Sequence, residues 1–365
     1  MATQSEVVFR IPDTLTFWPW PRKINPHHEE VKAASDAWFQ SFKAFGPEAQ
    51  RAFECCDPSL LASLGYASAT KEHLRTGCDL MNLFFSFDEY TDIAPPEIVR
   101  QYADIVMDAI RNPSKPRPSD EVVLGVIAQE YSSFYLHVKL ILTMKYRFWA
   151  LGVKSASSTS QKHFVESFGY YVDSVVQQAE DRHRRHIRNV EDYFDIRRLT
   201  VGVSPAHALL ELGYDLPDEV FNHPTVIALR RLGVDMMILD NDLASYNKEQ
   251  ALEEYPHNIL ASVMNELKCD LHDALSWVGE LYRSTRNKFL MLWTEIPSWG
   301  PETDVIASQY LHGIANWVRG NESWDFESGR YFGSNGIAVQ QHRMVTLMPK
   351  QLSTSEPLLV HVQSL

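Results

Sequence analysis

The chain contains 365 residues, of which 45% are hydrophobic and 22% are charged. This is the composition of a globular protein that buries a large apolar core, in one large domain or about two ordinary ones. Its 34 basic and 47 acidic residues give a formal net charge of −13. Such a charge argues against non-specific nucleic-acid binding, because that binding needs a basic surface.

No apolar run approaches the roughly 20 residues that cross a bilayer. The first ten residues lack the basic and apolar regions of a signal peptide. The four cysteines are too few for a disulfide scaffold, and their spacing matches no zinc motif. We therefore expect a cytoplasmic protein with reduced thiols, no membrane span and no nucleic-acid partner.

Residues 1–27 are expected to form an N-terminal arm. The stretch from Phe9 to Pro26 is rich in proline and aromatic residues, and proline disfavours helix both at its own position and at the preceding one. An extended arm follows from this. Phe17, Trp18 and Trp20 are too apolar for a free tail, so the arm should lie against the folded body.

After Pro26 apolar residues recur three and four positions apart, which is the pattern of amphipathic helices. Breaks rich in proline, glycine or asparagine divide this pattern, and alternating strand patterns are almost absent. We expect an all-α domain over residues 28–340 and a C-terminal tail over residues 341–365. The predicted helices cover residues 28–45, 70–91, 95–111, 119–150, 160–190, 204–213, 216–247, 255–294 and 301–319.

The segment FFSFDEYTD (residues 84–92) ends an apolar helix with acidic residues. Asp88 and Asp92 are four positions apart, so both carboxylates share one helix face, with Glu89 beside them. Like charges at this spacing repel, whereas an oxygen-rich cluster suits a hard cation such as magnesium. The alternative is a solvated acidic patch near a helix end.

A second polar segment, NDLASYNKE (residues 241–249), also follows an apolar helix. Asn241, Ser245 and Glu249 are spaced by four, which aligns an amide, a hydroxyl and a carboxylate over two helical turns. Lys248 lies near the same face, and a cation beside a metal site is useful if a polyanion bridges the two. The alternative is a polar helix terminus capped by Asp242 and Asn247.

Isolated cations form the third feature. Arg197 and Arg198 precede a helix break marked by Gly202, and Arg330 is followed by Tyr331 near the C-terminus. Arginine binds phosphate oxygens in a forked geometry, and a tyrosine hydroxyl can donate to one. Surface salt bridges are the alternative for each of them.

Together these features describe a magnesium-assisted clamp for a diphosphate. Magnesium binds phosphate together with one or two carboxylates, and such a clamp neutralises a leaving diphosphate. The 9 Trp, 15 Tyr and 18 Phe residues could line a dry cavity beside it, although most of them must be ordinary core. Aromatic faces also stabilise cations.

The order DEYTD, an arginine, NDLASYNKE and an Arg-Tyr pair resembles the class I terpene synthases of fungi. The likeness extends from WPWPRKINPH in the arm to RYFGSNGIAVQQHRMVTLMP near the end. Within that family the chain is most similar to the basidiomycete sesquiterpene synthases that close farnesyl diphosphate between carbons 1 and 11, and among these to the protoilludene synthases. The resemblance implies the class I helical bundle with a central apolar pocket.

Site residues also follow from the resemblance. Asp88 would ligate two magnesium ions, with Asp92 assisting, and Asn241, Ser245 and Glu249 would hold a third. The diphosphate would be bound by Arg197, Lys248, Arg330 and Tyr331, with Arg198 as the alternative diphosphate sensor. The cation would face Phe84, Phe85 and Trp324, for which ordinary core packing is the alternative. Glu89 stands where many relatives carry aspartate.

The implied reaction is ionisation of farnesyl diphosphate, 1,11-closure to a humulyl cation, and further closure to a tricyclic hydrocarbon, with Δ6-protoilludene as the first choice. Viridiflorol, caryophyllene, humulene and sterpurene are alternative products. A non-catalytic prenyl-diphosphate binder is the alternative of another class. The protein would act as a monomer or a homodimer.

Overall fold

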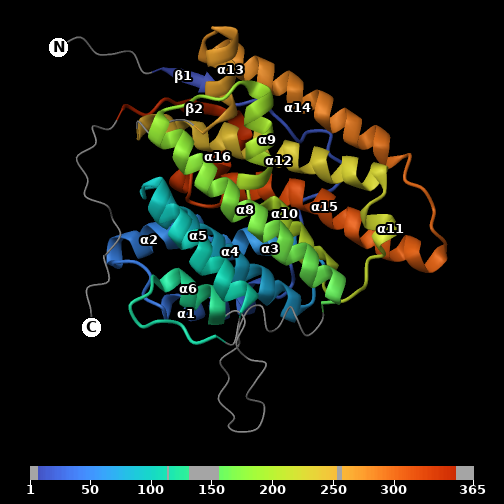
Figure 1. Cartoon of the computed structure of the whole chain (residues 1–365). Helices are drawn as coiled ribbons and strands as arrows, with labels where there is room; N and C mark the ends of the chain where they lie inside the picture. Colours follow the sequence, from blue (N-terminus) through green and yellow to red (C-terminus); the bar gives the residue numbers. More distant parts are fainter. Residues whose placement is uncertain (1–6, 113–114, 131–155, 253–256, 351–365) are drawn as a thin grey trace, which may run out of the picture.

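A computed structural model describes residues 7–112, 115–130, 156–252 and 257–350, and within them the protein is the predicted all-α bundle (Figure 1). A single two-stranded sheet accompanies the helices in these ranges. The elements are β1 (Val8–Arg10), α1 (His28–Gln40), α2 (Pro47–Cys56), α3 (Pro58–Gly65), α4 (Lys71–Thr91), α5 (Pro96–Arg111), α6 (Val123–Glu130), α8 (Ser158–Arg184), α9 (Val190–Thr200), α10 (Val203–Ala208), η2 (Leu209–Glu211), α11 (Asp218–Phe221), α12 (Pro224–Ala251), α13 (Ile259–Leu267), α14 (Leu271–Trp293), α15 (Pro301–Glu327), η3 (Gly333–Asn335), α16 (Gly336–His342) and β2 (Met344–Thr346).

Three long helices, α4, α12 and α15, lie at the centre and are buried on most of their surface. Helix α12 packs between α14 and α15, and α3 packs against both α4 and α15. The contact between α3 and α15 depends on Gly320, because a Cβ there would approach the backbone of Leu64 to 2.9 Å. Close packing of this kind holds the central helices in a fixed register.

Helix ends follow local chemistry where the sequence signal is strong. The Thr70 side chain accepts a hydrogen bond from the His73 amide and starts α4, and Pro96 occupies the first turn of α5. Both helices match the predicted ranges to within one residue. Helix α15 is longer than predicted and ends at Glu327. Helix α12 starts later than predicted, at Pro224, and ends later, at Ala251.

Other boundaries were predicted wrongly. Helices α2 and α3 were not predicted, and the segment 160–190 ends at Arg184, with α9 following as a separate helix. The segment 255–294 divides into α13 and α14 at Lys268. Arg185 and Lys268 adopt left-handed backbone conformations (φ +52° for both), which end a helix without a glycine signal. Of the segment 119–150, only the part up to residue 130 lies in the described residues.

The arm lies against the bundle and the C-terminal segment. Strand β1 pairs antiparallel with β2, and the Trp18 indole donates to the Ala315 carbonyl. The Arg319 guanidinium donates to the carbonyls of Leu15 and Trp20. Phe17 does not pack as expected: its side chain is 73% exposed and contacts the cation of Arg286 at 5.5 Å.

The boundary expected at residue 340 falls inside α16, so the C-terminal segment continues the helical body before it joins the arm in the sheet. In the described ranges, no helix combines the length and apolarity that a membrane span requires.

Candidate functional site

A cavity of about 230 Å³ opens among α3, α4, α8, α9, α10, α12 and α15. Apolar side chains such as Leu61, Met81, Met237 and Trp317 line part of it, and charged side chains line the rest. The structure brings every predicted site residue to this cavity: Phe84, Phe85, Asp88, Asp92, Arg197, Asn241, Ser245, Lys248, Glu249, Trp324, Arg330 and Tyr331.

The acidic residues of α4 are paired with cations that also border the cavity. Arg330 Nη2 donates to Asp88 Oδ2 at 3.2 Å, and its Nη1 lies 3.6 Å from Glu89 Oε1. Arg182 Nη1 lies 3.9 Å from Asp92 Oδ1. Asp88 and Asp92 line the cavity, with side chains 43% and 40% exposed. Their pairing with Arg330 and Arg182 at a cavity wall differs from a solvated acidic patch, in which the carboxylates would face water alone.

On α12, the three spaced oxygens face the same cavity. Asn258 Nδ2 donates to Glu249 Oε2 at 3.0 Å and lies 3.4 Å from Ser245 Oγ. Asn241 Oδ1 accepts from Arg197 Nη2 at 2.7 Å. The alternative of a capped helix end does not hold, because α12 continues beyond Asn241 as far as Ala251.

Asp242 follows Asn241 directly but does not share the role of Asn241, Ser245 and Glu249. Its buried carboxylate accepts hydrogen bonds from the Tyr193 hydroxyl, from the Arg197 guanidinium (3.2 Å) and from the Ile259 amide (2.9 Å). These donors come from α9 and from the start of α13. Asp242 therefore joins three helices and holds Arg197 at the cavity, rather than capping a helix.

Arg330 and Tyr331 connect the two polar motifs. While Arg330 pairs with Asp88 on α4, the Tyr331 hydroxyl accepts from Asn241 Nδ2 on α12 at 2.8 Å. Two consecutive residues after α15 thus bridge opposite walls of the cavity. Each carries a donor group of the type that phosphate oxygens accept from, the guanidinium of Arg330 and the hydroxyl of Tyr331.

The structure distinguishes Arg197 from Arg198. The Arg198 guanidinium pairs with Asp235 (2.7 Å) and Asp195 (3.0 Å) and does not line the cavity. Arg197 lines the cavity and bridges Asn241 and Asp242. The choice of Arg197 as the inward arginine agrees with this geometry.

Burial shifts the proton affinities in the cavity. Burial, together with the negative charge of Asp242, raises the pKa of Glu249 to about 7. Burial alone would lower the pKa of Arg197, but the carboxylate of Asp242 raises it above its usual value. Burial and the nearby arginines Arg197 and Arg188 hold the pKa of His257 well below its usual range, so its ring is neutral at pH 7.

The three aromatic residues predicted for the pocket, Phe84, Phe85 and Trp324, line the cavity and also pack against the hydrophobic core. Phe84 stacks on Phe168 with ring centroids 5.4 Å apart. Phe85 meets Trp324 edge to face at 5.3 Å, and the Arg330 guanidinium lies 4.9 Å from the Phe85 ring centroid. The aromatic rings therefore lie between the charged part of the cavity and its apolar part.

Comparisons with known proteins show the family of this chain. The family model described as "Terpene synthase family 2, C-terminal metal binding" matches residues 79–288, more than half of the chain. The chain belongs to the terpene synthase family. The two polar motifs and Arg197 all lie within the matched residues.

Curated relatives of this terpene synthase match nearly the whole chain. It is 50% identical to a Δ6-protoilludene synthase of Stereum hirsutum over 96% of this chain and 90% of that protein. It is 48% identical to sesquiterpene synthase 14 of Postia placenta, over 96% and 95% of the two chains. Identity to the Δ6-protoilludene synthase of Armillaria gallica is 47%, over 94% of each chain. The resemblance found in the sequence is confirmed.

The solved structures confirm the fold. Germacradien-4-ol synthase from Streptomyces citricolor superposes with a TM-score of 0.71 at 21% identity, covering 86% of this chain and 98% of that one. The SVS_A2 protein from ancestral sequence reconstruction gives a TM-score of 0.67 at 22% identity, covering 85% and 88%. The class I helical bundle is thus the architecture of this terpene synthase.

Several charged residues of the cavity were not predicted. Arg182 donates to the carbonyls of Thr91 and Ala94, and Arg188 pairs with Asp181 at 2.6 Å. Both belong to the segment EDRHRRHIR (residues 180–188), which is rich in basic residues. That richness could have indicated an anion-binding segment. Tyr193 and His257 gave no such signal, because their partners Asp242 and Thr200 lie 49 and 57 residues away in the sequence. Asn258 was not predicted either.

The donor set fits a divalent metal ion of the hard type. Groups of three or more His, Cys, Asp and Glu side chains with metal-site geometry are absent from the described residues. The cavity instead offers carboxylates from α4 and a carboxylate, a hydroxyl and an amide oxygen from α12. Such an incomplete oxygen set suits a cation that shares its coordination with phosphate oxygens.

Arg197→Lys tests the inward arginine. Lysine retains the charge beside buried Asp242 but cannot bridge Asp242 and Asn241 with one planar group. We expect the affinity for inorganic diphosphate with magnesium, measured by thermal-shift titration, to fall roughly ten- to hundredfold, since charged hydrogen bonds contribute about 1.5–3 kcal/mol. Arg198→Lys is the matched control and should retain wild-type affinity. Weaker binding in Arg198→Lys together with wild-type affinity in Arg197→Lys would show that Arg198, and not Arg197, binds the diphosphate.

Proposed function

We propose that this terpene synthase is a magnesium-dependent sesquiterpene cyclase that converts farnesyl diphosphate into Δ6-protoilludene and releases diphosphate. The observation that carries the proposal is the cavity in which a charged wall joins an aromatic one at Arg330 and Phe85. The names of the Stereum and Armillaria relatives support the product. Residues 28–340 would form the catalytic α domain.

The charged wall would bind the head of the substrate. Asp88 would hold two magnesium ions with Asp92 assisting, and the aligned oxygens of α12, from Asn241, Ser245 and Glu249, would hold a third. Bound magnesium supplies positive charge that neutralises the departing diphosphate. The donors Arg197, Lys248, Arg330 and Tyr331 would orient the phosphate oxygens.

The apolar wall would bind the hydrocarbon tail and control its folding. Phe84, Phe85 and Trp324 present ring faces to a carbocation, which the ring quadrupole attracts. Exclusion of water by these rings protects the cation from quenching. The shape of the cavity decides which carbons meet, so ring closure depends on proximity and orientation.

Proton loss would end the reaction. The retained diphosphate is the base we favour, since it is held by the same donors at the cavity wall. Another sesquiterpene as product is the nearest alternative, because two of the Postia relatives are named only as sesquiterpene synthases.

Incubation of the purified protein with farnesyl diphosphate, followed by gas chromatography and mass spectrometry, tests the proposal. We expect a tricyclic hydrocarbon that forms with magnesium and disappears with EDTA. A different hydrocarbon would overturn the product. No hydrocarbon, despite thermal stabilisation by magnesium diphosphate, would favour a non-catalytic binder.

Asp88→Ala should lower turnover of farnesyl diphosphate by at least roughly a hundredfold, because it removes a metal ligand and an electrostatic stabiliser of the leaving group. The melting temperature should change little, since the side chain is 43% exposed. Asp104→Ala on α5 is the control, because this acid is 68% exposed and lies outside the cavity. Wild-type turnover in Asp88→Ala would refute the metal-site assignment.

Phe85→Leu should change the product spectrum more than it lowers the rate of substrate consumption. Leucine keeps apolar volume but removes the ring face that meets Trp324 and Arg330. The product ratio from gas chromatography measures the effect. Phe221→Leu, whose ring stacks on His163 outside the cavity, should leave the ratio unchanged. An unchanged ratio in Phe85→Leu would place that ring outside the reacting region.

A further inference from the structure

A sharp corner between α2 and α3 contacts the segment that carries Trp324 and Arg330. We propose that this corner, Cys55–Asp57, is a positioning element that holds both the diphosphate donor Arg330 and the cavity wall residue Trp324. The inference rests on the proposed function. It adds residues that belong to neither polar motif and do not line the cavity.

The corner binds Trp324 through its backbone. The indole Nε1 donates to the Cys56 carbonyl at 2.8 Å and to the Asp57 carbonyl at 3.1 Å. Trp324 is 1% exposed, so its only side-chain N–H group depends on these two acceptors. The position of the corner therefore fixes the position of the indole ring against Phe85.

The corner also holds the chain just before Arg330. The Gly329 amide donates to the Cys55 carbonyl at 2.8 Å. A Cβ at Gly329 would lie 3.0 Å from that carbonyl oxygen, which is closer than ordinary side-chain contacts allow. A glycine at this position lets the backbone of the Arg330 segment approach the corner.

Arg330 itself is held by the thiol of Cys56. Its Nη1 donates to Cys56 Sγ at 3.3 Å. The Cys56 thiol donates in turn to the Ala52 carbonyl at 3.4 Å, which turns the sulfur lone pairs toward the guanidinium. Sulfur is a weak acceptor, so it orients Arg330 without adding a third negative charge to those of Asp88 and Glu89, which already lie beside the guanidinium.

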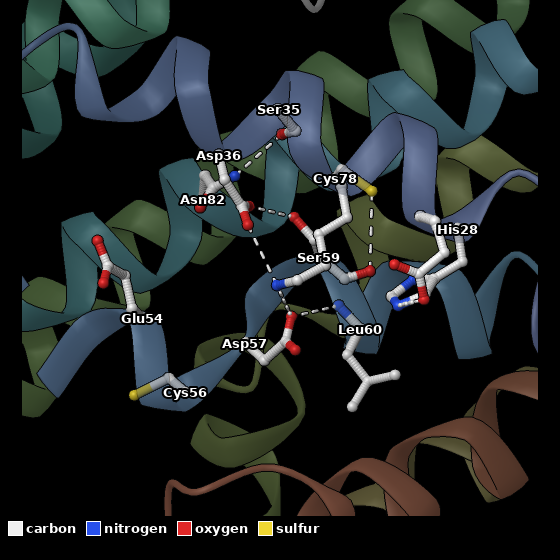
Figure 2. Close-up of polar contacts among 12 residues, drawn as sticks. His28, Ser35, Asp36, Glu54, Cys56, Asp57, Ser59, Leu60, Cys78 and Asn82 are labelled. Atoms are coloured by element: carbon white, nitrogen blue, oxygen red, sulfur yellow. Dashed lines mark hydrogen bonds and ion pairs between the residues drawn. The ribbon is translucent and has the colours of Figure 1, made fainter. Parts of the chain in front are cut away.

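The corner is fixed from the opposite side. Asp57 has a left-handed backbone (φ +45°, ψ +64°), and its Oδ1 accepts from the Leu60 amide at 3.0 Å, which starts α3 (Figure 2). Lys32 Nζ on α1 lies 2.7 Å from Asp57 Oδ1 and 3.1 Å from Asp36 Oδ2. Asp36 accepts from the Ser59 hydroxyl at 2.8 Å. This network ties the corner to α1 and α3.

The arrangement gives Cys56 and Lys32 separable effects. Loss of the Cys56 thiol removes the acceptor for Arg330 but leaves the carbonyls that hold Trp324. Loss of the Lys32 cation leaves the Asp57 and Asp36 carboxylates without their shared partner, which loosens the whole corner. The first change should act on diphosphate affinity alone, and the second on affinity and product ratio together.

The experiment compares Cys56→Ala, Cys56→Ser, Cys55→Ala and Lys32→Met in the full chain. Thermal-shift titration with inorganic diphosphate and magnesium should show roughly three- to tenfold weaker binding for Cys56→Ala, with recovery in Cys56→Ser, whose hydroxyl also accepts. With farnesyl diphosphate, Cys56→Ala should raise KM more than it lowers kcat and should keep the wild-type product ratio. Lys32→Met should weaken diphosphate binding and also change that ratio.

Cys55→Ala is the matched control, since it removes a neighbouring exposed thiol and keeps the backbone carbonyl. A merely structural corner would lower the melting temperature of the variants without changing KM or the product ratio. Cys56→Ala with the diphosphate affinity of Cys55→Ala would overturn the role of the thiol, and a wild-type product ratio in Lys32→Met would overturn the hold on Trp324. A wild-type protein that forms no hydrocarbon would refute the proposed function, while the diphosphate titration would still decide how Arg330 is held.

Discussion

The bridge made by Arg330 and Tyr331 is the constraint on which the cavity depends. Acidic groups on α4 and polar oxygens on α12 face one another, and carboxylates brought together without a cation repel. Arg330 lies beside Asp88 and Glu89, while Tyr331 bonds to Asn241 on the other wall. The turn after α15 therefore sets the spacing of the two motifs, and any change in that turn reaches both of them.

The charged groups of the cavity form ion pairs and hydrogen bonds with one another, and the same groups can bind a charged ligand. Arg197 is bonded to both Asn241 and Asp242, so a buried guanidinium has no uncompensated charge. Breaking one partner of such a buried pair is strongly destabilising. Asp242 also accepts from the Tyr193 hydroxyl and the Ile259 amide. Those two donors would still satisfy the carboxylate if Arg197 bound an anion instead.

The sequence predicted the features that local spacing determines. Asp88 and Asp92, or the aligned oxygens of α12, could be found because a helix places every fourth residue on one face. The contacts of the corner could not be found, because the Asp57 carboxylate pairs with Lys32 on α1 and the Asp57 carbonyl accepts from Trp324, 267 residues away. The role of Asp242 could not be found either, and a helix cap was considered for it only as the alternative. Its partners on α9 and α13 lie in segments whose boundaries were predicted wrongly.

The net charge of −13 raises the question of how an anionic substrate reaches this cavity. Charges further apart than about 8 Å are largely screened at physiological ionic strength, so the field of the distant acidic surface counts little at the site. Four carboxylates line the cavity. They are outnumbered by five cationic side chains, which are those of Arg182, Arg188, Arg197, Lys248 and Arg330. Divalent cations held by those carboxylates would make the local balance strongly positive. Recognition of the diphosphate therefore depends on charges within one screening length, and the acidic surface elsewhere can serve solubility without opposing binding.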